Sequence, residues 1–350
     1  MCGIFGHYSL NGANPDLVER MAQRLAHRGP DGYGTYRSED GTLAFGAGRL
    51  AIIDLDAGMM PIFNEDRSVA VVFNGEIYNH LALRKDLEAA GHVFSTHTDT
   101  EVVVLGYVLW GVVVIARLRG MFALCVWDEN NNQLHLARDF AGEKPLYYMQ
   151  HNGAFLFASE IKALLLHEGM RPAVDEDALL HFLAVGYVPP PLTMFAGIHK
   201  LGPGELMVVN RDGVQVRPYR VPQMDTRHTD LSYDEAVAAV REKLTEAVEM
   251  RLMSDVPVGA FLSGGVDSTA VVAMMGRAMG RPVETFTVGF NFDDDPNNDM
   301  KFNVDQRYGK RASEMLGTHH HEITVQQSNA LSGVFPHLVM AMDEPVAQHA

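Results

Sequence analysis

Cysteine is scarce in this chain, which has only Cys2 and Cys125 among 350 residues. Two thiols so far apart provide neither a disulfide framework nor the CxxC spacing of a zinc site. Such a chain is typical of a reducing compartment, and we expect a cytoplasmic protein. The residues after Met1 also lack the basic and long apolar stretches of a secretory signal, so no signal peptide is expected.

Cationic residues are also few: the chain has 28 Lys and Arg against 44 Asp and Glu, which gives a formal net charge of -16. Gripping nucleic acid needs a cationic surface, so we expect no nucleic-acid partner, although a local pocket for one nucleotide stays open. Apolar runs such as residues 112–116 are far too short to cross a membrane. With 47% hydrophobic residues and no internal repeat, the length suits two domains with separate cores.

The first part of the chain, residues 1–210, predicts an α+β domain with much antiparallel sheet. Asn14 followed by Pro15 indicates a helix start, with an apolar stripe at four-residue spacing from Leu17. Thr98 and Glu101 predict a capping box for a second helix. Buried or half-buried strands are expected at residues 3–8, 69–73, 118–127, 134–138 and 155–159.

Residues 211–231 are polar, contain two prolines and show no periodicity, which predicts a linker. Residues 232–350 then form a second domain in which strand and helix signals alternate. Ser232 and Glu235 indicate a capped helix at its start. Alternation of this kind favours a parallel sheet with crossover helices. The expected elements are a helix to about 253, strands at 256–262, 284–290 and 320–325, and helices at 268–279 and 304–316.

The position of Cys2 directly after Met1 can be interpreted as catalytic or as merely structural. Removal of Met1 gives Cys2 a free α-amine, which titrates at roughly 7.7–8.0 in model peptides and can activate the thiol beside it. Taken alone, Cys2 is more simply interpreted as a small apolar residue that starts a strand. Four polar interruptions between apolar stretches favour the catalytic interpretation: RGPDG (28–32), GAGRLAIID (46–54), FNGEIYN (73–79) and HTDTE (97–101).

In this order after MCGI, the four segments closely resemble the class II glutamine amidotransferase domain over roughly residues 1–200. The resemblance implies an N-terminal-nucleophile hydrolase with a layered αββα fold. It implies that Cys2 attacks the glutamine amide, and that the Asn74 side chain and the Gly75 N–H stabilise the oxyanion. The glutamine-binding residues that it implies are Arg49, Leu50, Ile53, Asn74, Gly75, Glu76 and Asp99.

Within that set, Arg49 would clamp the α-carboxylate of glutamine with its planar fork. Glu76 and Asp99 would hold the α-ammonium, and the backbones of Leu50 and Ile53 would line the pocket. Each residue also has an ordinary interpretation, in which Arg49 is a surface cation, Asn74-Gly75 a hairpin turn and Asp99 an acid in the first turn of a helix. Cys125 lies in the apolar stretch MFALCVW and is expected in the core.

A second motif, AFLSGGVDS at residues 260–268, joins a predicted strand to a predicted helix. Backbone N–H groups at such a loop can bind an anion, helped by the helix N-terminus. It lacks the GK[ST] ending of a Walker loop, and alone it could be a glycine-rich turn. It resembles the SGGxDS pyrophosphate loop of ATP pyrophosphatases, which implies an α/β parallel-sheet domain of that type. The ATP-binding residues implied are Leu262, Ser263, Gly264, Gly265, Asp267, Ser268 and Val288.

The two motifs together, with RDFAGEKPLYY at residues 138–148, resemble the layout of the glutamine-hydrolysing asparagine synthetase family. The implied reaction takes ammonia from glutamine and uses ATP with Mg²⁺ to adenylate an acceptor carboxylate, in the first instance aspartate, giving asparagine, AMP and pyrophosphate. Asp267 is the candidate for holding the metal or organising the loop, and a homodimer is compatible with the resemblance. The alternatives are a sugar-acid or peptide acceptor, or a glutaminase or non-catalytic glutamine-binding protein with a vestigial synthetase half.

The chain departs from that family in three places. Met60 stands where relatives usually carry glutamine, and residues 112–116 are more apolar than in relatives. A second acidic loop of the SGEGSDE type is missing before Ala350, so we expect a fragment or a truncated product with an incomplete synthetase half. The final MDEPVAQHA resembles the DEP region of bacterial relatives. We expect no metal site at the histidines of residues 319–321, because adjacent strand residues face opposite ways.

Overall fold

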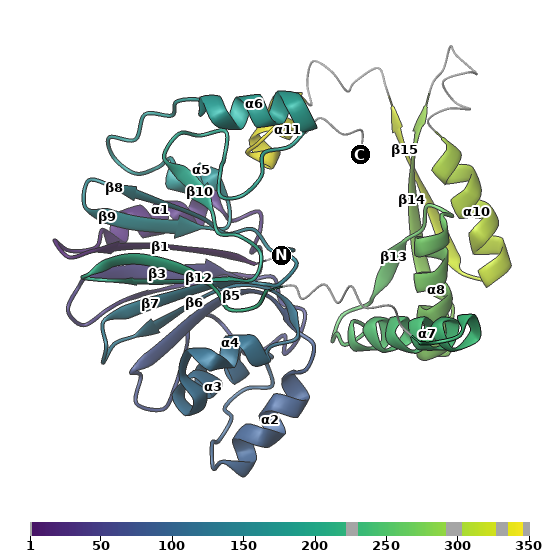
Figure 1. Cartoon of the computed structure of the whole chain (residues 1–350), viewed down its shortest axis with the longest axis horizontal. Helices are drawn as coiled ribbons and strands as arrows, with labels where there is room; N and C mark the ends of the chain where they lie inside the picture. Colours follow the sequence, from purple (N-terminus) through teal and green to yellow (C-terminus); the bar gives the residue numbers. More distant parts are fainter. Residues whose placement is uncertain (1, 222–229, 292–302, 327–334, 346–350) are drawn as a thin grey trace. The chain divides into compact units, whose positions relative to one another are not determined.

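The computed structural model describes residues 2–221, 230–291, 303–326 and 335–345 (Figure 1). The chain divides into two compact units. Unit 1 comprises residues 1–223 together with 339–350, and unit 2 comprises residues 224–338. Residues 339–345 therefore belong to the first unit, whereas the sequence predicts them in the second domain.

Unit 1 contains two antiparallel sheets of six strands each. The first sheet has the strand order β10 (Ile198–Lys200), β8 (Tyr147–His151), β9 (Ala154–Ala158), β1 (Gly3–Ser9), β3 (Leu43–Gly48) and β2 (Tyr33–Arg37). The second has the order β12 (Gly213–Pro218), β11 (Glu205–Asn210), β7 (Gln133–Arg138), β6 (Gly120–Asp128), β5 (Val69–Ile77) and β4 (Ile62–Phe63). The helices of this unit are α1 (Pro15–Arg24), α2 (His80–Ala89), α3 (Glu101–Trp110), the 3₁₀ turn η1 (Gly111–Val113), α4 (Val114–Arg117), α5 (Ile161–Leu164) and α6 (Glu176–Val185).

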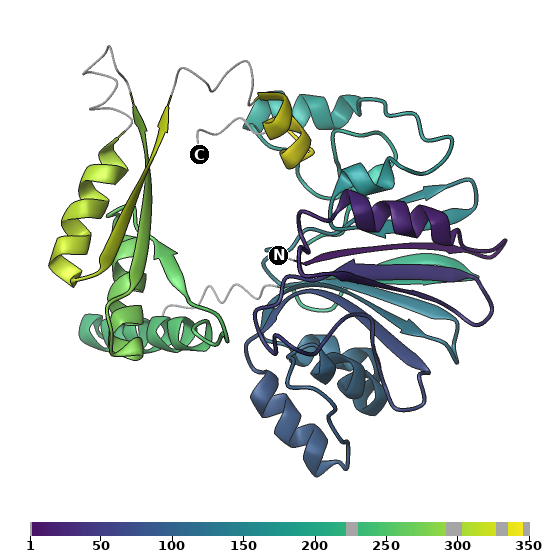
Figure 2. The ribbon, with the colours of Figure 1, turned by 180° about the vertical axis from the view of Figure 1, so that it is seen from behind.

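The two sheets pack face to face and carry helices on their outer faces. Ile4 of β1 and Phe73 of β5 meet in the core between the sheets, whereas Phe5 packs with Leu17 of α1 on the other face of β1. Strand β1 is buried along its whole length for this reason. Figures 1 and 2 both show α1 and α5 on one side of the paired sheets and α2 to α4 on the other. The layered αββα architecture predicted from the sequence is confirmed.

In unit 1, one helix start predicted from the sequence is confirmed and another is wrong. Asn14 accepts a hydrogen bond from the Leu17 N–H, so α1 begins as predicted. The capping box of Thr98 and Glu101 is wrong, because Glu101 is the first residue of α3 and the cap position is Thr100. The Glu101 carboxylate instead accepts the backbone N–H groups of residues 95 and 96 and so fastens the preceding loop.

The predicted linker at residues 211–231 also needs correction at its start. Residues Gly213–Pro218 form β12, which pairs with β11 along six residues. Pro218 is tolerated there because β12 is an edge strand of its sheet.

Unit 2 is built on a parallel sheet with the order β13 (Gly259–Phe261), β14 (Glu284–Asn291) and β15 (His319–Gln326). Its helices are α7 (Tyr233–Met250), α8 (Val266–Met279) and α10 (Val304–Leu316), followed by α11 (Phe335–Met342), which crosses the boundary between the units. The predicted capping box of Ser232 and Glu235 starts α7. The strand–helix alternation is thus confirmed. None of the helices described here is both long and apolar enough to span a bilayer.

Candidate functional site

The residues predicted around Cys2 come together at one cavity in unit 1. Cys2 directly precedes β1, and its sulfur approaches a loop that follows β3. The cavity is lined by Cys2, Arg49, Leu50, Ile52, Ile53, Gly58, Met60, Phe73, Gly75, Glu76, Thr98, Asp99 and Thr100. Seven of the eight predicted residues are therefore in its wall, and Asn74 is the neighbour of one of them in the chain.

The Cys2 thiol is held by the backbone of Leu50. The Leu50 N–H donates to the sulfur at 3.4 Å, and the sulfur lies 3.7 Å from the Leu50 carbonyl oxygen. Burial raises the pKa of Cys2, so the group stays a neutral thiol near pH 7 unless a base takes its proton. The main chain of Cys2 is fixed as well, since the Arg28 Nε donates to its carbonyl oxygen at 3.0 Å.

Asn74 and Gly75 lie inside β5, paired with residues 123 and 122 of β6, and do not form a hairpin turn. Gly75 is required by space, because a Cβ there would lie 2.0 Å from the Met121 carbonyl oxygen. Asn74 is 1% exposed, and its Nδ2 has no hydrogen-bond partner among the residues that the structure describes. Leaving a buried donor without an acceptor costs about 1–3 kcal/mol of folding stability. The Asn74 amide is therefore available to donate a hydrogen bond to a bound ligand.

Arg49 is buried and is not a surface cation. Its guanidinium donates to the carbonyl oxygens of Ile53 at 3.1 Å and Asp54 at 2.5 Å, and so folds the loop that lines the cavity. Carbonyl oxygens satisfy its N–H groups without neutralising its charge. The positive end of the cavity is consequently suited to an anion.

The opposite charge is supplied by two carboxylates, of which Asp99 is buried and Glu76 is half-buried. Asp99 accepts the Ile77 N–H at 2.7 Å and does not serve as a first-turn acid of α3, which begins two residues later. Burial and the nearby Asp99 carboxylate raise the pKa of Glu76 to about 8, while the positive charge of Lys144 opposes the shift. Burial also raises the pKa of Asp99. Two acids that are hard to ionise together favour a cation between them.

The second predicted site lies in unit 2, between β13 and α8. Gly264 has a φ of 75°, and a Cβ there would lie 2.2 Å from the Tyr308 carbonyl carbon, so only glycine fits the turn. The Ser263 and Ser268 hydroxyls lie 3.0 Å apart across the loop. Gly265 caps α8 without a side chain, which leaves the first-turn N–H groups of that helix facing the loop.

The other residues predicted to bind ATP are Leu262, Asp267 and Val288. Leu262 is buried and donates its N–H to the Phe286 carbonyl oxygen at 2.9 Å, while Val288 on β14 is partly exposed. Asp267 stands exposed in the first turn of α8, where its oxygen atoms suit a hard cation. Among the described residues, no group of three or more His, Cys, Asp or Glu side chains is placed to hold a metal ion by itself.

Sequence reasoning missed three charged groups beside the thiol site. Arg28 lies in the RGPDG segment, which gives it no predicted role, and the sequence gives no sign of Glu160, which pairs with Arg28 at 2.8 Å. Lys144 lies in the RDFAGEKPLYY segment, which does not predict its effect on the pKa of Glu76. A local sequence pattern cannot predict this ion pair, because Arg28 and Glu160 are 132 positions apart in the chain.

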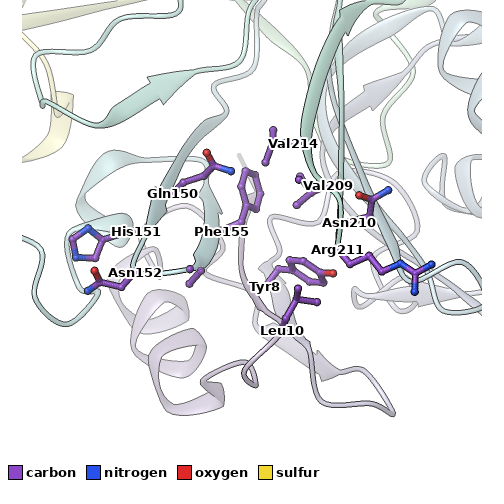
Figure 3. A pocket seen from close by; sticks show the side chains of 13 residues that line it. Tyr8, Leu10, Gln150, His151, Asn152, Phe155, Val209, Asn210, Arg211 and Val214 are labelled. Carbon is purple, nitrogen blue, oxygen red and sulfur yellow. The ribbon is translucent and has the colours of Figure 1, made fainter.

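A different pocket opens in unit 1 near the other end of β1 (Figure 3). Tyr8, Phe155 and Arg211 are among the side chains that line it. An extended strand rises about 3.3 Å per residue, which places Tyr8 roughly 20 Å from Cys2. This pocket is therefore separate from the thiol site.

Comparison with known proteins gives a consistent result for both units. A glutamine amidotransferase domain model matches residues 1–220, and an asparagine synthase model matches residues 239–350. Glutamine-hydrolyzing asparagine synthetase 1 of Bacillus subtilis is 37% identical over 83% of this chain and 46% of its own length. Asparagine synthetase 3 of the same organism is 35% identical over 94% of this chain and 55% of its own length. The chain thus spans about half the length of these curated relatives.

Among solved structures, glutamine phosphoribosylpyrophosphate amidotransferase from B. subtilis aligns with a TM-score of 0.48 at 20% identity. The alignment covers 80% of this chain and 65% of that chain.

Proposed function

The chain belongs to the glutamine amidotransferase domain family, and we propose that it hydrolyses the side-chain amide of glutamine at Cys2 and releases ammonia. The observation that carries the proposal is the convergence of a thiol, a buried cation, a buried carboxylate and a half-buried carboxylate on one cavity. Free glutamine offers one amide, one carboxylate and one ammonium. The cavity holds a group of matching chemistry for each of the three.

In the proposed reaction, removal of Met1 frees the α-amine of Cys2, which takes the proton of its own thiol. The thiolate then attacks the amide carbon of glutamine and forms a tetrahedral oxyanion. The unpartnered Nδ2 of Asn74 and the N–H of Gly75 are the donors proposed for this oxygen. The α-ammonium of Cys2 passes its proton to the amide nitrogen, so that collapse of the intermediate expels ammonia and leaves a glutamyl thioester on Cys2, which water hydrolyses to glutamate.

Binding of glutamine is assigned to the charged groups of the cavity. Arg49 is proposed to attract the α-carboxylate, because its present partners are neutral carbonyl oxygens. Glu76 and Asp99 are proposed to receive the α-ammonium. The Leu50 and Ile53 backbones complete the wall.

For the whole protein we propose glutamine-dependent amide synthesis of the asparagine synthetase type in the cytoplasm. The loop at residues 262–268 would bind the phosphates of ATP through its N–H groups, and Asp267 would share Mg²⁺ with those phosphates. Adenylation activates the acceptor carboxylate, for which aspartate is the first candidate. Ammonia from the first site then displaces AMP and forms the amide bond.

The test is an assay with purified components. The chain is incubated with glutamine alone, and glutamate and ammonia are measured; ATP, Mg²⁺ and aspartate are then added, and pyrophosphate and asparagine are measured. We expect equal amounts of glutamate and ammonia in the first step. No glutamate above a protein-free blank would contradict the glutaminase proposal. Pyrophosphate formed only with a different acid would keep the mechanism and change the acceptor.

A further inference from the structure

The last described residues of the chain contact the rest of unit 1 through two acids whose side chains are largely covered. Asp343 pairs with Lys162 at 3.0 Å, and its other oxygen accepts the Ile161 N–H at 2.7 Å. Glu344 pairs with Lys200 at 2.8 Å and accepts the Met194 N–H at 3.1 Å. The side chains of both ion pairs are between 7% and 14% exposed, so these contacts are inside the protein.

Asp343 adopts an unusual backbone conformation to make its contacts. Its φ is 61°, in the left-handed region that L-residues other than Asn and Asp rarely visit. Such a conformation persists only where its surroundings fix it. The contacts of Asp343 with Lys162 and with the Ile161 N–H hold the turn in this left-handed conformation.

From Asp343 a continuous chain of charged side chains leads to Cys2. Lys162 contacts both Asp343 and Glu160. Glu160 pairs with Arg28 at 2.8 Å, and the Arg28 Nε donates to the Cys2 carbonyl oxygen at 3.0 Å. We call Arg28, Glu160, Lys162 and Asp343 the ionic chain.

The ionic chain is balanced, because its two cations face two anions. His27 also contacts Glu160, but its side chain is half exposed. Burial alone would raise the pKa of Glu160, yet hydrogen bonds from Lys162, Arg28 and His27 hold it below its usual value. Loss of the Asp343 charge would leave an excess buried cation, and Lys162 would then compete with Arg28 for Glu160.

Resting on the glutaminase function proposed above, we propose that Asp343 is a positioning residue for the thiol site, acting through Lys162, Glu160 and Arg28 on the main chain of Cys2. Docking of residues 339–345 on unit 1 thereby sets how well Cys2 is placed for attack. These residues lie in the stretch that matches the asparagine synthase model. The ionic chain is thus a route by which that stretch of sequence acts on glutamine hydrolysis.

The test compares Asp343→Asn with the matched control Glu344→Gln in the full chain. Asn keeps the left-handed turn and can still accept the Ile161 N–H, so this variant removes mainly the charge. Glu344 docks the same segment, but Lys200 and Met194 are not part of the ionic chain. We expect Asp343→Asn to lower kcat for glutamine roughly 3- to 30-fold, the range of coupling carried by side-chain networks, with KM unchanged. Glu344→Gln should leave kcat within twofold of the unmodified chain.

A second variant guards against unfolding. The paired change Lys162→Met with Asp343→Asn removes both charges without leaving either one unpaired, and Asn still suits the left-handed turn and accepts the Ile161 N–H. It should lower kcat as Asp343→Asn does while the melting temperature stays near that of the unmodified chain. An unchanged kcat in both variants, or an equal loss in Glu344→Gln, would overturn the proposal.

A readout that needs no turnover keeps this inference separate from the proposed function. Cys125 is fully buried, so iodoacetamide added to the folded protein reports on Cys2. The alkylation rate of Cys2 should change in Asp343→Asn and stay the same in Glu344→Gln. If the unmodified chain releases no ammonia, the glutaminase proposal fails, while equal alkylation rates in all variants would overturn the positioning role.

Discussion

Glu76 and Asp99 are neighbouring acids of the thiol site, where burial and then the Asp99 carboxylate raise the pKa of Glu76 to about 8. Lys144 opposes this shift with its positive charge. Near pH 7 the site therefore holds a proton that a bound ammonium group would displace. Binding of glutamine and loss of that proton are expected to be linked.

The first prediction concerns that linkage. In a Cys2→Ala variant, which cannot consume its ligand, glutamine binding should strengthen as the pH rises from 6 to 8, by up to about tenfold per pH unit. Titration calorimetry in two buffers of different ionisation enthalpy should detect proton release at pH 7. Glu76→Gln cannot release this proton, so the pH dependence should disappear. A pH-independent affinity in the Glu76-containing protein would contradict the assignment.

The same shift has a consequence for stability. Glu76 ionises near its ordinary value in the unfolded chain but only near pH 8 in the folded one. The folded state therefore binds more protons between these values, and stability falls as the pH rises through this window. Glu76→Gln should flatten that part of the profile in urea unfolding experiments.

A second prediction addresses Arg49. Arg49→Lys keeps the positive charge but loses the planar fork, so KM for glutamine should rise roughly tenfold, corresponding to about 1.5 kcal/mol for a charged hydrogen bond. Because Arg49 also holds the carbonyls of Ile53 and Asp54, the melting temperature should be recorded in parallel. A folded variant with an unchanged KM would show that Arg49 does not clamp the carboxylate.

A third prediction addresses Asn74. Its Nδ2 makes no protein hydrogen bond among the described residues, so Asn74→Asp removes a donor without breaking a contact of the folded state. We expect kcat to fall by about 10²- to 10³-fold with a small change in KM, as for other oxyanion donors. Asn79→Asp, also in the FNGEIYN segment but outside the cavity wall, is the comparison variant. A kcat within threefold of the unmodified chain would remove Asn74 from the proposed mechanism.

Features encoded by neighbouring residues were predictable from the sequence. Asn14 before Pro15 and Ser232 with Glu235 start α1 and α7 as expected, since a cap and its N–H partner are three residues apart. The residues of the thiol cavity were found through ordered motifs, although the chain alone gives no direct sign that Arg49 and Asp99 meet. Their proximity depends on the pairing of strands from distant segments.

Features decided by distant partners were missed. The spacing of Thr98 and Glu101 matches a capping box, but the Glu101 carboxylate finds better donors in the loop before it. Residues 213–218 look like a linker, and only the pairing with β11 makes them a strand. Asp343 contacts residues about 180 positions earlier, which no periodicity reveals.

The central claim is that Cys2 is the nucleophile that releases ammonia from glutamine. The most direct measurement is ammonia release by the unmodified chain and by Cys2→Ala, with intact mass spectrometry to show whether Met1 has been removed. Cys125→Ala is the control, because it deletes the other thiol in the buried core. We predict that the unmodified chain and Cys125→Ala release ammonia, and that folded Cys2→Ala releases none. Release by Cys2→Ala at a rate within tenfold of the unmodified chain would contradict the claim.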